Sequence, residues 1–439
     1  MIEGMEEPDA RTDPRTEETI FTWGAPPLKF GPGATDEIGF DVSRYPGVRR
    51  VLILTDPGVL ATGIPHRVAD SLAAAGLSYE IFDGVHVEPT DESFEKAVGY
   101  ARSQGPWDAF VAVGGGSSID TAKAANLLTS NPGELMDYVS APIGLGLAPP
   151  QELKPLIAVP TTSGTGAEAT SMCVLDILSM KVKTAISHWR LRPTMAVVDP
   201  LLTMNLPAEV TASSGMDICC HALESYTSRW YGDYDHKRPE ERVTYCGSNP
   251  IADLWAEKAL SLLAASFRRA VHHGREDLAA RTDMMMAATF AGMGFGSAGC
   301  HIPHADSYPI AGRVEGYHPA GYPSDEPMVP HGQAVSLTAP EVFRFTFSAA
   351  PERHLRAAKL LAPDLDRGND PAEELPRALV ALMRDIDIPN GIGAVGYSEA
   401  DVGDLVPGAM KQQRLLVNCP RPVDEDDLAG IFTRSVENW

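Results

Sequence analysis

The sequence has no long apolar run and few cysteines. No window approaches the roughly 20 consecutive apolar residues of a membrane span, so we expect no membrane-crossing helix and no membrane partner. The six cysteines form no CxxC pair, which argues against a zinc ribbon and against a disulfide framework. We therefore expect small buried thiols in a reducing compartment.

Basic residues are also scarce. There are 36 lysines and arginines against 59 acids, for a net charge of -23, which argues against nucleic acid as a partner because that needs a basic surface. The first 18 residues hold seven acids and no apolar run, unlike a secretory or mitochondrial presequence. The composition thus predicts a disordered acidic tail over residues 1–20 of a cytoplasmic protein.

The pattern of apolar residues along the chain changes near Pro207. Before it, short apolar runs alternate with helical patterns, which is typical of a parallel, doubly wound sheet. After it, helical patterns dominate, interrupted by two long loops at 229–249 and 313–330. We predict an α/β nucleotide-binding domain over 21–206 and an all-helical domain over 207–439. The strand-like runs lie at 51–54, 79–82, 109–113, 155–159 and 195–198.

Two glycine-bearing loops follow predicted strands. Gly114-Gly115-Gly116-Ser117 leads from a strand into a helix, and Thr161-Thr162-Ser163-Gly164-Thr165-Gly166 follows a later strand. Glycines let the backbone approach a ligand, and the free N–H groups of a helix start favour phosphate. A tight turn without a ligand is the alternative. Two such loops at the carboxyl ends of neighbouring strands favour a bound nucleotide.

Asp56 ends the first strong strand. A carboxylate there can accept hydrogen bonds from both ribose hydroxyls and would repel a 2′-phosphate, which favours NAD over NADP. The alternative role is that of a helix cap.

Acidic and histidine side chains gather in three segments of the second half. Asp217 and His221 are four residues apart in a helical pattern with apolar flanks, so both project from one buried face. His301, His304 and His331 follow in a short interval near irregular backbone. A carboxylate with three imidazoles suits iron or zinc and disfavours calcium and magnesium. An ordinary surface Asp–His pair is the alternative for the first two residues.

Several motifs together resemble a known family, the iron-containing (group III) alcohol dehydrogenases. The similarity begins near residue 25 and continues through the rest of the chain. It implies the dehydroquinate synthase-like fold, in which a dinucleotide-binding α/β domain precedes a helical metal-binding domain. The motifs, in order, are GGGSSIDTAK, PTTSGTGAEAT, GMDICCHALESY, HADSYP and VPHG.

The resemblance also implies a role for individual residues. The metal ligands fall on Asp217, His221, His304 and His331. The implied cofactor contacts are Asp56, Gly116, Ser117, Thr161, Thr162, Val174 and Lys183, and from the same motifs we add Gly114, Gly115, Asp120 and Thr165.

The sequence departs from the family at two places. The usual histidine four residues after His304 is replaced by Tyr308, and an asparagine on the pyrophosphate side is replaced near Glu88. Both features, with the stretches around Cys246 and His354, resemble the hydroxyacid-oxoacid transhydrogenase branch. That branch passes a hydride from 4-hydroxybutyrate to 2-oxoglutarate, giving succinate semialdehyde and 2-hydroxyglutarate.

We therefore expect a homo-oligomeric enzyme that uses NAD and Fe²⁺, with Zn²⁺ as a possible substitute. A simple NAD-dependent alcohol dehydrogenase or aldehyde reductase is the main alternative. A dehydroquinate synthase-like lyase would need basic phosphate-binding residues near the metal, and no lysine cluster is present. Tyr308 and His301 are further catalytic candidates. A hydroxyacid substrate needs a cation for its carboxylate, and Arg242, then Arg238, in the loop after His221 are the predicted positions.

Overall fold

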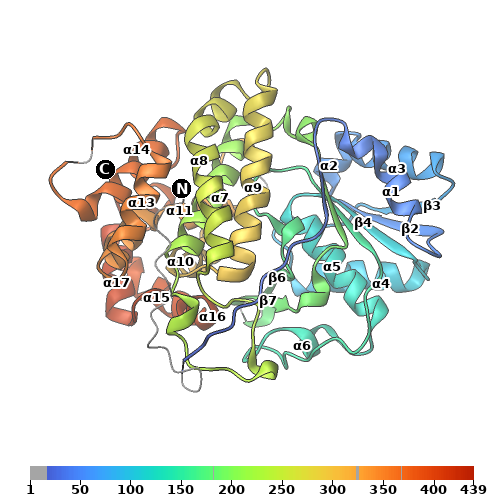
Figure 1. Cartoon of the computed structure of the whole chain (residues 1–439), viewed down its shortest axis with the longest axis horizontal. Helices are drawn as coiled ribbons and strands as arrows, with labels where there is room; N and C mark the ends of the chain where they lie inside the picture. Colours follow the sequence, from blue (N-terminus) through green and yellow to red (C-terminus); the bar gives the residue numbers. More distant parts are fainter. Residues whose placement is uncertain (1–16, 181, 323–325, 367) are drawn as a thin grey trace.

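The computed structural model describes residues 17–180, 182–322, 326–366 and 368–439. The first half forms an α/β unit and the second half a helical unit, which lie beside each other in Figure 1. This arrangement confirms the predicted fold class. Residues 1–16 of the predicted acidic tail lie outside the described residues.

The α/β unit is built on a six-stranded parallel sheet with strand order β1-β8-β5-β4-β2-β3. The chain runs from β2 outward to β3 and then returns to β4 on the other side of β2. The strand order therefore reverses between β2 and β4, the point where open α/β sheets bind ligands. The strands are β1 (Leu28–Phe30), β2 (Arg50–Leu54), β3 (Ser78–Phe82), β4 (Ala109–Gly114), β5 (Leu156–Pro160) and β8 (Met195–Val198).

Alternate residues of each strand face opposite sides of this sheet, and both sides are covered by helices. Val51 and Ile53 of β2 pack in one core with α1 (Ile38–Ser43) and α3 (Ile64–Ala74). Leu52 and Leu54 pack in another core with the helices on the opposite face. Burial on both faces explains why these strands are nearly continuous apolar runs. The helices of the second face are α4 (Asp91–Gln104) and α5 (Gly116–Ser130).

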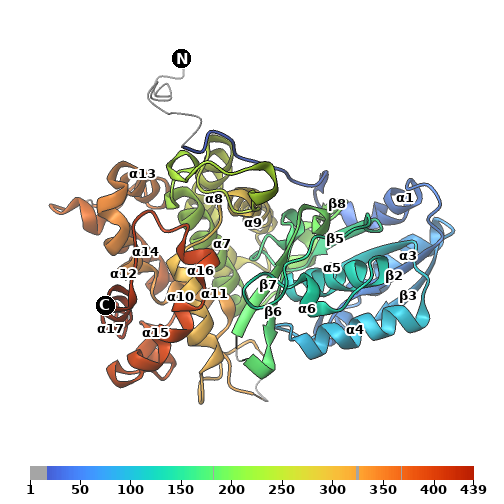
Figure 2. The ribbon, with the colours of Figure 1, turned by 90° about the horizontal axis from the view of Figure 1, so that it is seen from below.

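A two-stranded antiparallel hairpin, β6 (Met172–Ile177) and β7 (Val182–Ser187), was not among the predicted strands. Its strands carry charged residues such as Asp176 and Lys183 and form no long apolar run. Figure 2 shows the hairpin between the main sheet and the helical unit. The side-chain amide of Gln412, from the helical unit, donates to the Lys183 carbonyl over 3.3 Å. The hairpin thus joins the two halves.

The helical unit packs around one large apolar core. Residues 331–346 form two helices and not one, because Pro340 can occupy only the first turn of a helix and a new helix therefore begins beside it. The helices are α7 (Ala208–Thr227), α8 (Pro250–His273), α9 (Leu278–Ala298), α10 (Ile302–Gly312), α11 (His331–Ser336), α12 (Ala339–Thr346), α13 (Pro351–Leu361), α14 (Glu374–Asp385), α15 (Val402–Met410), α16 (Gln413–Leu416) and α17 (Glu425–Arg434).

The two units touch closely where a loop of the first meets α9. A Cβ atom on Gly166, whose φ is +59°, would lie 2.7 Å from the Cα atom of Gly292. Both positions therefore need glycine for the backbones to approach. The boundary near Pro207 stays a prediction, and α7 begins at Ala208. Among the described residues, every helix is too short or too polar to cross a bilayer.

Candidate active site

Four predicted ligands come together from three helices. Asp217 and His221 lie on α7, His304 on α10 and His331 on α11. One carboxylate oxygen of Asp217, Oδ1, is 3.6 Å from His221 Nδ1, 3.6 Å from His304 Nε2 and 3.8 Å from His331 Nε2. Asp217, His221 and His304 are buried, and His331 is about a quarter exposed.

The unpaired atoms of this cluster fit a cation. Asp217 Oδ1 and His221 Nδ1 are buried without a hydrogen-bond partner. His304 Nδ1 lies 2.6 Å from the Glu224 carboxylate, so it donates and leaves Nε2 for a metal ion. Nε2 of His221 lies 2.9 Å from Nε2 of His304, so one cation could accept a lone pair from each ring. A metal ion there would also compensate the buried Asp217 carboxylate.

Glu224 orients His304. It accepts the hydrogen bond from His304 Nδ1 over 2.6 Å and a second one from the backbone N–H of His301, also over 2.6 Å. Carboxylates that hold the outer nitrogen of a ligating histidine set its tautomer and orientation. Glu224 is not among the predicted site residues, although Asp217, His221 and Glu224 follow the i, i+4, i+7 spacing of one helix face.

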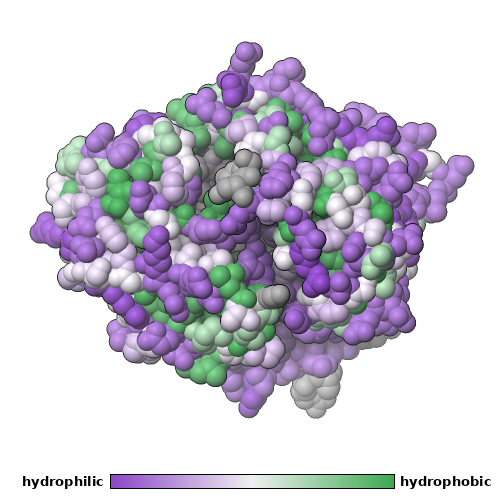
Figure 3. Space-filling view, turned by 180° about the vertical axis from the view of Figure 1, so that it is seen from behind, coloured by the Kyte–Doolittle hydropathy of each residue, from purple (hydrophilic) through white to green (hydrophobic). Residues whose placement is uncertain are grey.

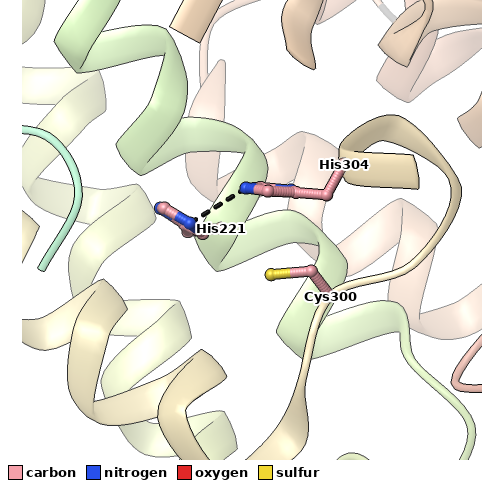
Figure 4. Close-up of side chains that lie close together, drawn as sticks. All are labelled: His221, Cys300 and His304. Carbon is pink, nitrogen blue, oxygen red and sulfur yellow. Dashed lines mark hydrogen bonds between the residues drawn. The ribbon is translucent and has the colours of Figure 1, made fainter. Parts of the chain in front are cut away.

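Aromatic and sulfur groups enclose the cluster. The ring of His221 stacks on Phe295 with centroids 3.9 Å apart. Figure 4 shows His221 and His304 pointing toward each other, with Cys300 beside them in the segment before α10. Ligand atoms of these three residues lie within 4.8 Å of one another. Burial raises the pKa of Cys300 to about 11, so this thiol is neutral at ordinary pH.

The charges of the cluster support one another. Burial alone would raise the pKa of Asp217, but the nearby His221, His331 and His304 hold it well below its ordinary value. Burial lowers the pKa of His221 to about 3 and also lowers that of His331. The carboxylate is therefore ionised and these two imidazoles are neutral, which are the forms that bind a metal. Burial would lower the pKa of His304, but Cys300, Glu224 and Asp217 raise it, so this ring has to release a proton when a metal binds.

The phosphate-loop motif lies at the carboxyl end of β4. A Cβ atom on Gly116 would come within 2.8 Å of the Thr165 side chain, so glycine keeps the two loops in contact. The N–H of Thr161 donates to the carbonyl of Gly114 over 3.0 Å and joins the loops after β4 and β5. A Cβ atom on Gly115 would meet the Thr162 hydroxyl at 3.3 Å. The two predicted loops form one backbone cradle at the switch point of the sheet.

Asp56 follows the carboxyl end of β2, at the same edge of the sheet as the two glycine-bearing loops. Its Oδ1 accepts a hydrogen bond from the N–H of Val59 over 2.9 Å and caps α2 (Pro57–Ala61). Its other oxygen lies 3.4 Å from the Ser118 hydroxyl at the start of α5. The cap and the ribose role can therefore coexist, one on each oxygen.

The hairpin places Val174 and Lys183 opposite α5. Asp120 of α5 accepts a hydrogen bond from the Val174 N–H over 3.0 Å. Lys183 forms a short ion pair with Glu88 and lies 3.3 Å from Asp176. Burial would lower the pKa of Lys183, but these two carboxylates raise it, so its charge is retained and neutralised.

One cavity joins the metal cluster to the phosphate loop. Figure 3 shows the molecule hollowed near the middle of the face opposite to that in Figure 1. The predicted residues that line the cavity are Asp217, His221, His304, His331, Gly116, Ser117, Asp120, Thr165, Val174, Lys183 and Tyr308. Those outside its lining are Asp56, Gly114, Gly115, Thr161, Thr162, His301, Arg238 and Arg242.

Three candidates for catalysis or substrate binding need correction. His301 lies behind the cluster, fully buried, with Nε2 3.1 Å from the Thr227 hydroxyl. Arg238 is exposed and pairs with Glu241. Arg242 pairs instead with buried Glu18 over 2.6 Å, away from the cavity. The loop leaves the end of α7 and runs over the surface, so closeness in sequence to His221 did not place its arginines at the site.

The cavity contains a different arginine, Arg414 of α16. It lies on the wall with Tyr245, Cys300 and Tyr308. Sequence reasoning missed it because it lies more than 80 residues beyond His331, and its surroundings in the sequence, Gln412-Gln413-Arg414-Leu415-Leu416, show no motif.

A nucleotide-type sheet facing a cluster of one aspartate and three histidines is the arrangement of a metal-dependent dehydrogenase. Comparison with known proteins gives the family. The family described as iron-containing alcohol dehydrogenase matches residues 26–200, and the C-terminal part of the Fe-containing alcohol dehydrogenase family matches residues 240–436. The chain belongs to the iron-containing alcohol dehydrogenase family, as its motifs predicted.

Individual relatives support the same family assignment. The chain is 44% identical over 432 residues to the mitochondrial hydroxyacid-oxoacid transhydrogenase of Bos taurus, covering 96% of this chain and 91% of the relative. It resembles a solved 1,3-propanediol oxidoreductase with a TM-score of 0.82 and 31% identity, covering 95% and 100% of the two chains. The sulfoacetaldehyde reductase of Bifidobacterium kashiwanohense, solved in complex with NAD⁺, gives a TM-score of 0.78 and 26% identity over 95% and 99%.

The predicted cytoplasmic location is wrong by this comparison. The bovine relative, which matches nearly the whole chain, is named as a mitochondrial protein. The prediction relied on the many acids among the first 18 residues, and composition alone did not decide the location.

Proposed function

We propose that this enzyme is a hydroxyacid-oxoacid transhydrogenase. It would take a hydride from C4 of 4-hydroxybutyrate and deliver it to C2 of 2-oxoglutarate, giving succinate semialdehyde and 2-hydroxyglutarate. The observation that carries the proposal is a single cavity whose wall holds the metal cluster, the phosphate loop and two partly buried cations, Lys183 and Arg414. The likeness to the bovine transhydrogenase over 96% of the chain supports the same reaction.

The metal we propose is Fe²⁺, with Zn²⁺ as a possible substitute. Asp217, His221, His304 and His331 would hold it, since a carboxylate and imidazoles suit either ion. A bound divalent ion supplies Lewis acidity, which favours loss of the proton from an alcohol and polarises a carbonyl in the reverse direction. Burial keeps His221 neutral, which is its metal-binding form, and the hydrogen bond to Glu224 orients the ring of His304.

The cofactor we propose is NAD. The glycine loop would receive the pyrophosphate at the start of α5, and Asp56 would accept the ribose hydroxyls with the oxygen that does not cap α2. The nicotinamide end would then enter the cavity between Val174 and the metal cluster. We also propose a homo-oligomer in solution.

Retention of the cofactor between two half-reactions separates this function from a simple dehydrogenase. The test is an incubation of iron-loaded protein with 2-oxoglutarate and 4-hydroxybutyrate carrying deuterium at C4, without added NAD. Co-purified cofactor would pass the label, so we expect mass spectrometry to find 2-hydroxyglutarate with deuterium at C2 and an equal amount of succinate semialdehyde. The hydroxyl proton released by the donor balances the proton taken up by the new alcohol.

Two controls complete this test. Excess unlabelled NADH should not dilute the label if the cofactor stays bound through both steps. If instead product forms only with added NAD, and free NADH accumulates, the enzyme is an NAD-dependent alcohol dehydrogenase and the transhydrogenase proposal fails.

A further inference from the structure

Arg414 is a partly buried cation without an acidic partner among the described residues. Its Nη2 donates to the Tyr308 hydroxyl over 2.7 Å. Its Nε is buried with no hydrogen-bond partner. Within the part of the chain that the structure describes, no carboxylate forms an ion pair with it. The other cation of the cavity, Lys183, is held by Glu88 and Asp176. A charge left unpaired in a buried site is costly, so Arg414 is poised to receive an anion.

The surroundings hold this guanidinium in place. The Arg414 guanidinium carbon lies 5.8 Å from the centroid of the Tyr308 ring, and Lys183 Nζ lies 6.0 Å from the same centroid. The Asn418 side chain donates to the Arg414 carbonyl over 3.2 Å and fixes the end of α16. Burial would lower the pKa of Arg414, but the neighbouring Tyr308 and Tyr245 raise it. The group is thus a fixed positive charge with free hydrogen-bond donors.

The two substrates of the proposed reaction share one spacing. In 4-hydroxybutyrate, three carbon–carbon bonds separate the reacting carbon from the carboxylate carbon. In 2-oxoglutarate, three carbon–carbon bonds separate the keto carbon from the distal carboxylate carbon. A single cation at a set distance from the metal cluster can therefore anchor both molecules with the reacting carbon in the same place.

We propose that Arg414 is this anchor, and that it binds the terminal carboxylate of both the hydroxyacid and the oxoacid while their reacting carbons lie at the metal cluster. This inference rests on the proposed function and adds the residue that selects its substrates. The fork of an arginine matches a carboxylate through two charge-assisted hydrogen bonds. The side chains of Met172, Tyr245 and Leu415 line the same cavity and provide an apolar wall for the methylene chain between the two ends.

The test compares the wild type with Arg414→Gln in single turnovers of the bound cofactor, with kcat/KM taken as the second-order rate constant for its reduction by the hydroxyacid and for its oxidation by the oxoacid. We expect the variant to lose roughly ten- to a hundred-fold for 4-hydroxybutyrate oxidation and by a similar factor for 2-oxoglutarate reduction, because a charge-assisted pair is lost. Oxidation of butan-1-ol, the neutral analogue, should change less than about three-fold. Arg421→Gln is the matched control, since Arg421 donates to the Phe345 carbonyl and does not line the cavity.

The outcomes separate the two proposals. A wild type that moves no hydride from hydroxyacid to oxoacid overturns the proposed function. A wild type that does so, with Arg414→Gln retaining full kcat/KM for both acids, overturns only the role of Arg414. A loss confined to one of the acids overturns the shared anchor.

A measurement on the wild type covers the case in which Arg414→Gln does not fold. Butyrate has the carboxylate and chain of 4-hydroxybutyrate without its hydroxyl group, and butyramide is its neutral counterpart. We expect butyrate to inhibit 4-hydroxybutyrate oxidation competitively and at least ten times more strongly than butyramide. Equal inhibition by the two compounds would show that no cation recognises the carboxylate, and would overturn the proposal.

Discussion

At the scale of single residues, the metal cluster depends on groups that are not ligands themselves. Glu224 is fully buried and has both carboxylate oxygens occupied by hydrogen bonds from the segment that carries His304. It fixes both the ring and the backbone of that segment. His304 Nε2 lies 3.6 Å from Asp217 Oδ1. Without Glu224, the ring of His304 could turn this nitrogen away from Asp217.

Replacing Glu224 with Gln tests this support. The amide keeps the shape but loses the charge that holds the His304 N–H, so we expect metal affinity to fall about 10- to 100-fold. Titration of the metal-free variant with Zn²⁺ in a competition assay measures the change. Glu257→Gln, on a partly exposed acid of α8 that pairs with Arg356, is the control. Unchanged affinity in Glu224→Gln would show that His304 is oriented without this carboxylate.

The charge of Asp56 should decide the choice of nicotinamide cofactor. Asp56→Ser keeps a side-chain oxygen to cap α2 but removes the negative charge. We expect NAD to bind roughly ten-fold more weakly and the preference for NAD over NADP to shrink, because repulsion of a 2′-phosphate is lost. The ratio of the Kd values for NAD and NADP, measured on protein stripped of its cofactor, gives this effect. A wild type that binds both equally would contradict the role of Asp56.

At the scale of elements, the contact between α12 and α13 contains a buried histidine. His354 of α13 is 1% exposed. Its Nδ1 donates to the Ala350 carbonyl over 2.8 Å, and its Nε2 lies 2.9 Å from the Thr346 hydroxyl. Burial lowers the pKa of His354 to about 4, with a smaller contribution from the nearby positive charge of Arg353. The folded protein therefore keeps this ring neutral where an unfolded chain would protonate it.

This shift predicts a loss of stability in mild acid. Because the pKa of His354 is lower in the folded state, the stabilisation is complete above the unfolded value near 6.5 and declines as pH falls toward 4. The contribution lost by pH 5.5 is about 1 kcal/mol of unfolding free energy. Denaturant unfolding at pH 7.5 and 5.5 should show a smaller pH effect in His354→Gln than in the wild type. An identical pH effect in both proteins would assign the acid sensitivity to other groups.

At the scale of the whole molecule, the metal site ties three helices together. Its proposed ligands belong to α7, α10 and α11, which are separated by long stretches of sequence. Cavity residues also come from both halves of the molecule. A ligand that binds only this assembled arrangement stabilises the folded state by mass action.

Metal removal should therefore lower the thermal stability of the entire chain. With metal at about 100 times its Kd, binding contributes about 2.7 kcal/mol, so chelation should lower Tm by several degrees and added Fe²⁺ or Zn²⁺ should restore it. Calorimetry measures the shift. Asp217→Ala should fold with the lower Tm and respond to neither treatment. A metal-dependent Tm that persists in Asp217→Ala would show that the ion binds elsewhere.

Local patterns in the sequence were enough to predict much of the fold and the family. Apolar runs predicted the central strands because burial on both faces requires them, and the glycine loop followed β4 as expected. The i, i+4 spacing of Asp217 and His221 follows from helix geometry alone. The same geometry extends to Glu224, so this residue could have been predicted as well.

Only the tertiary structure decided the features that depend on contacts between distant segments. His301 and His304 are equivalent by composition, and the direction of α10 placed the second one at the cluster. The hairpin strands β6 and β7 carry charged residues and form no continuous apolar run, and they lie between the two halves. Arg242 is next to the site in sequence but pairs with Glu18, whereas Arg414 enters the cavity from the end of the chain. Side-chain type determines which chemistry is available, but packing across hundreds of residues determines which side chains share a cavity.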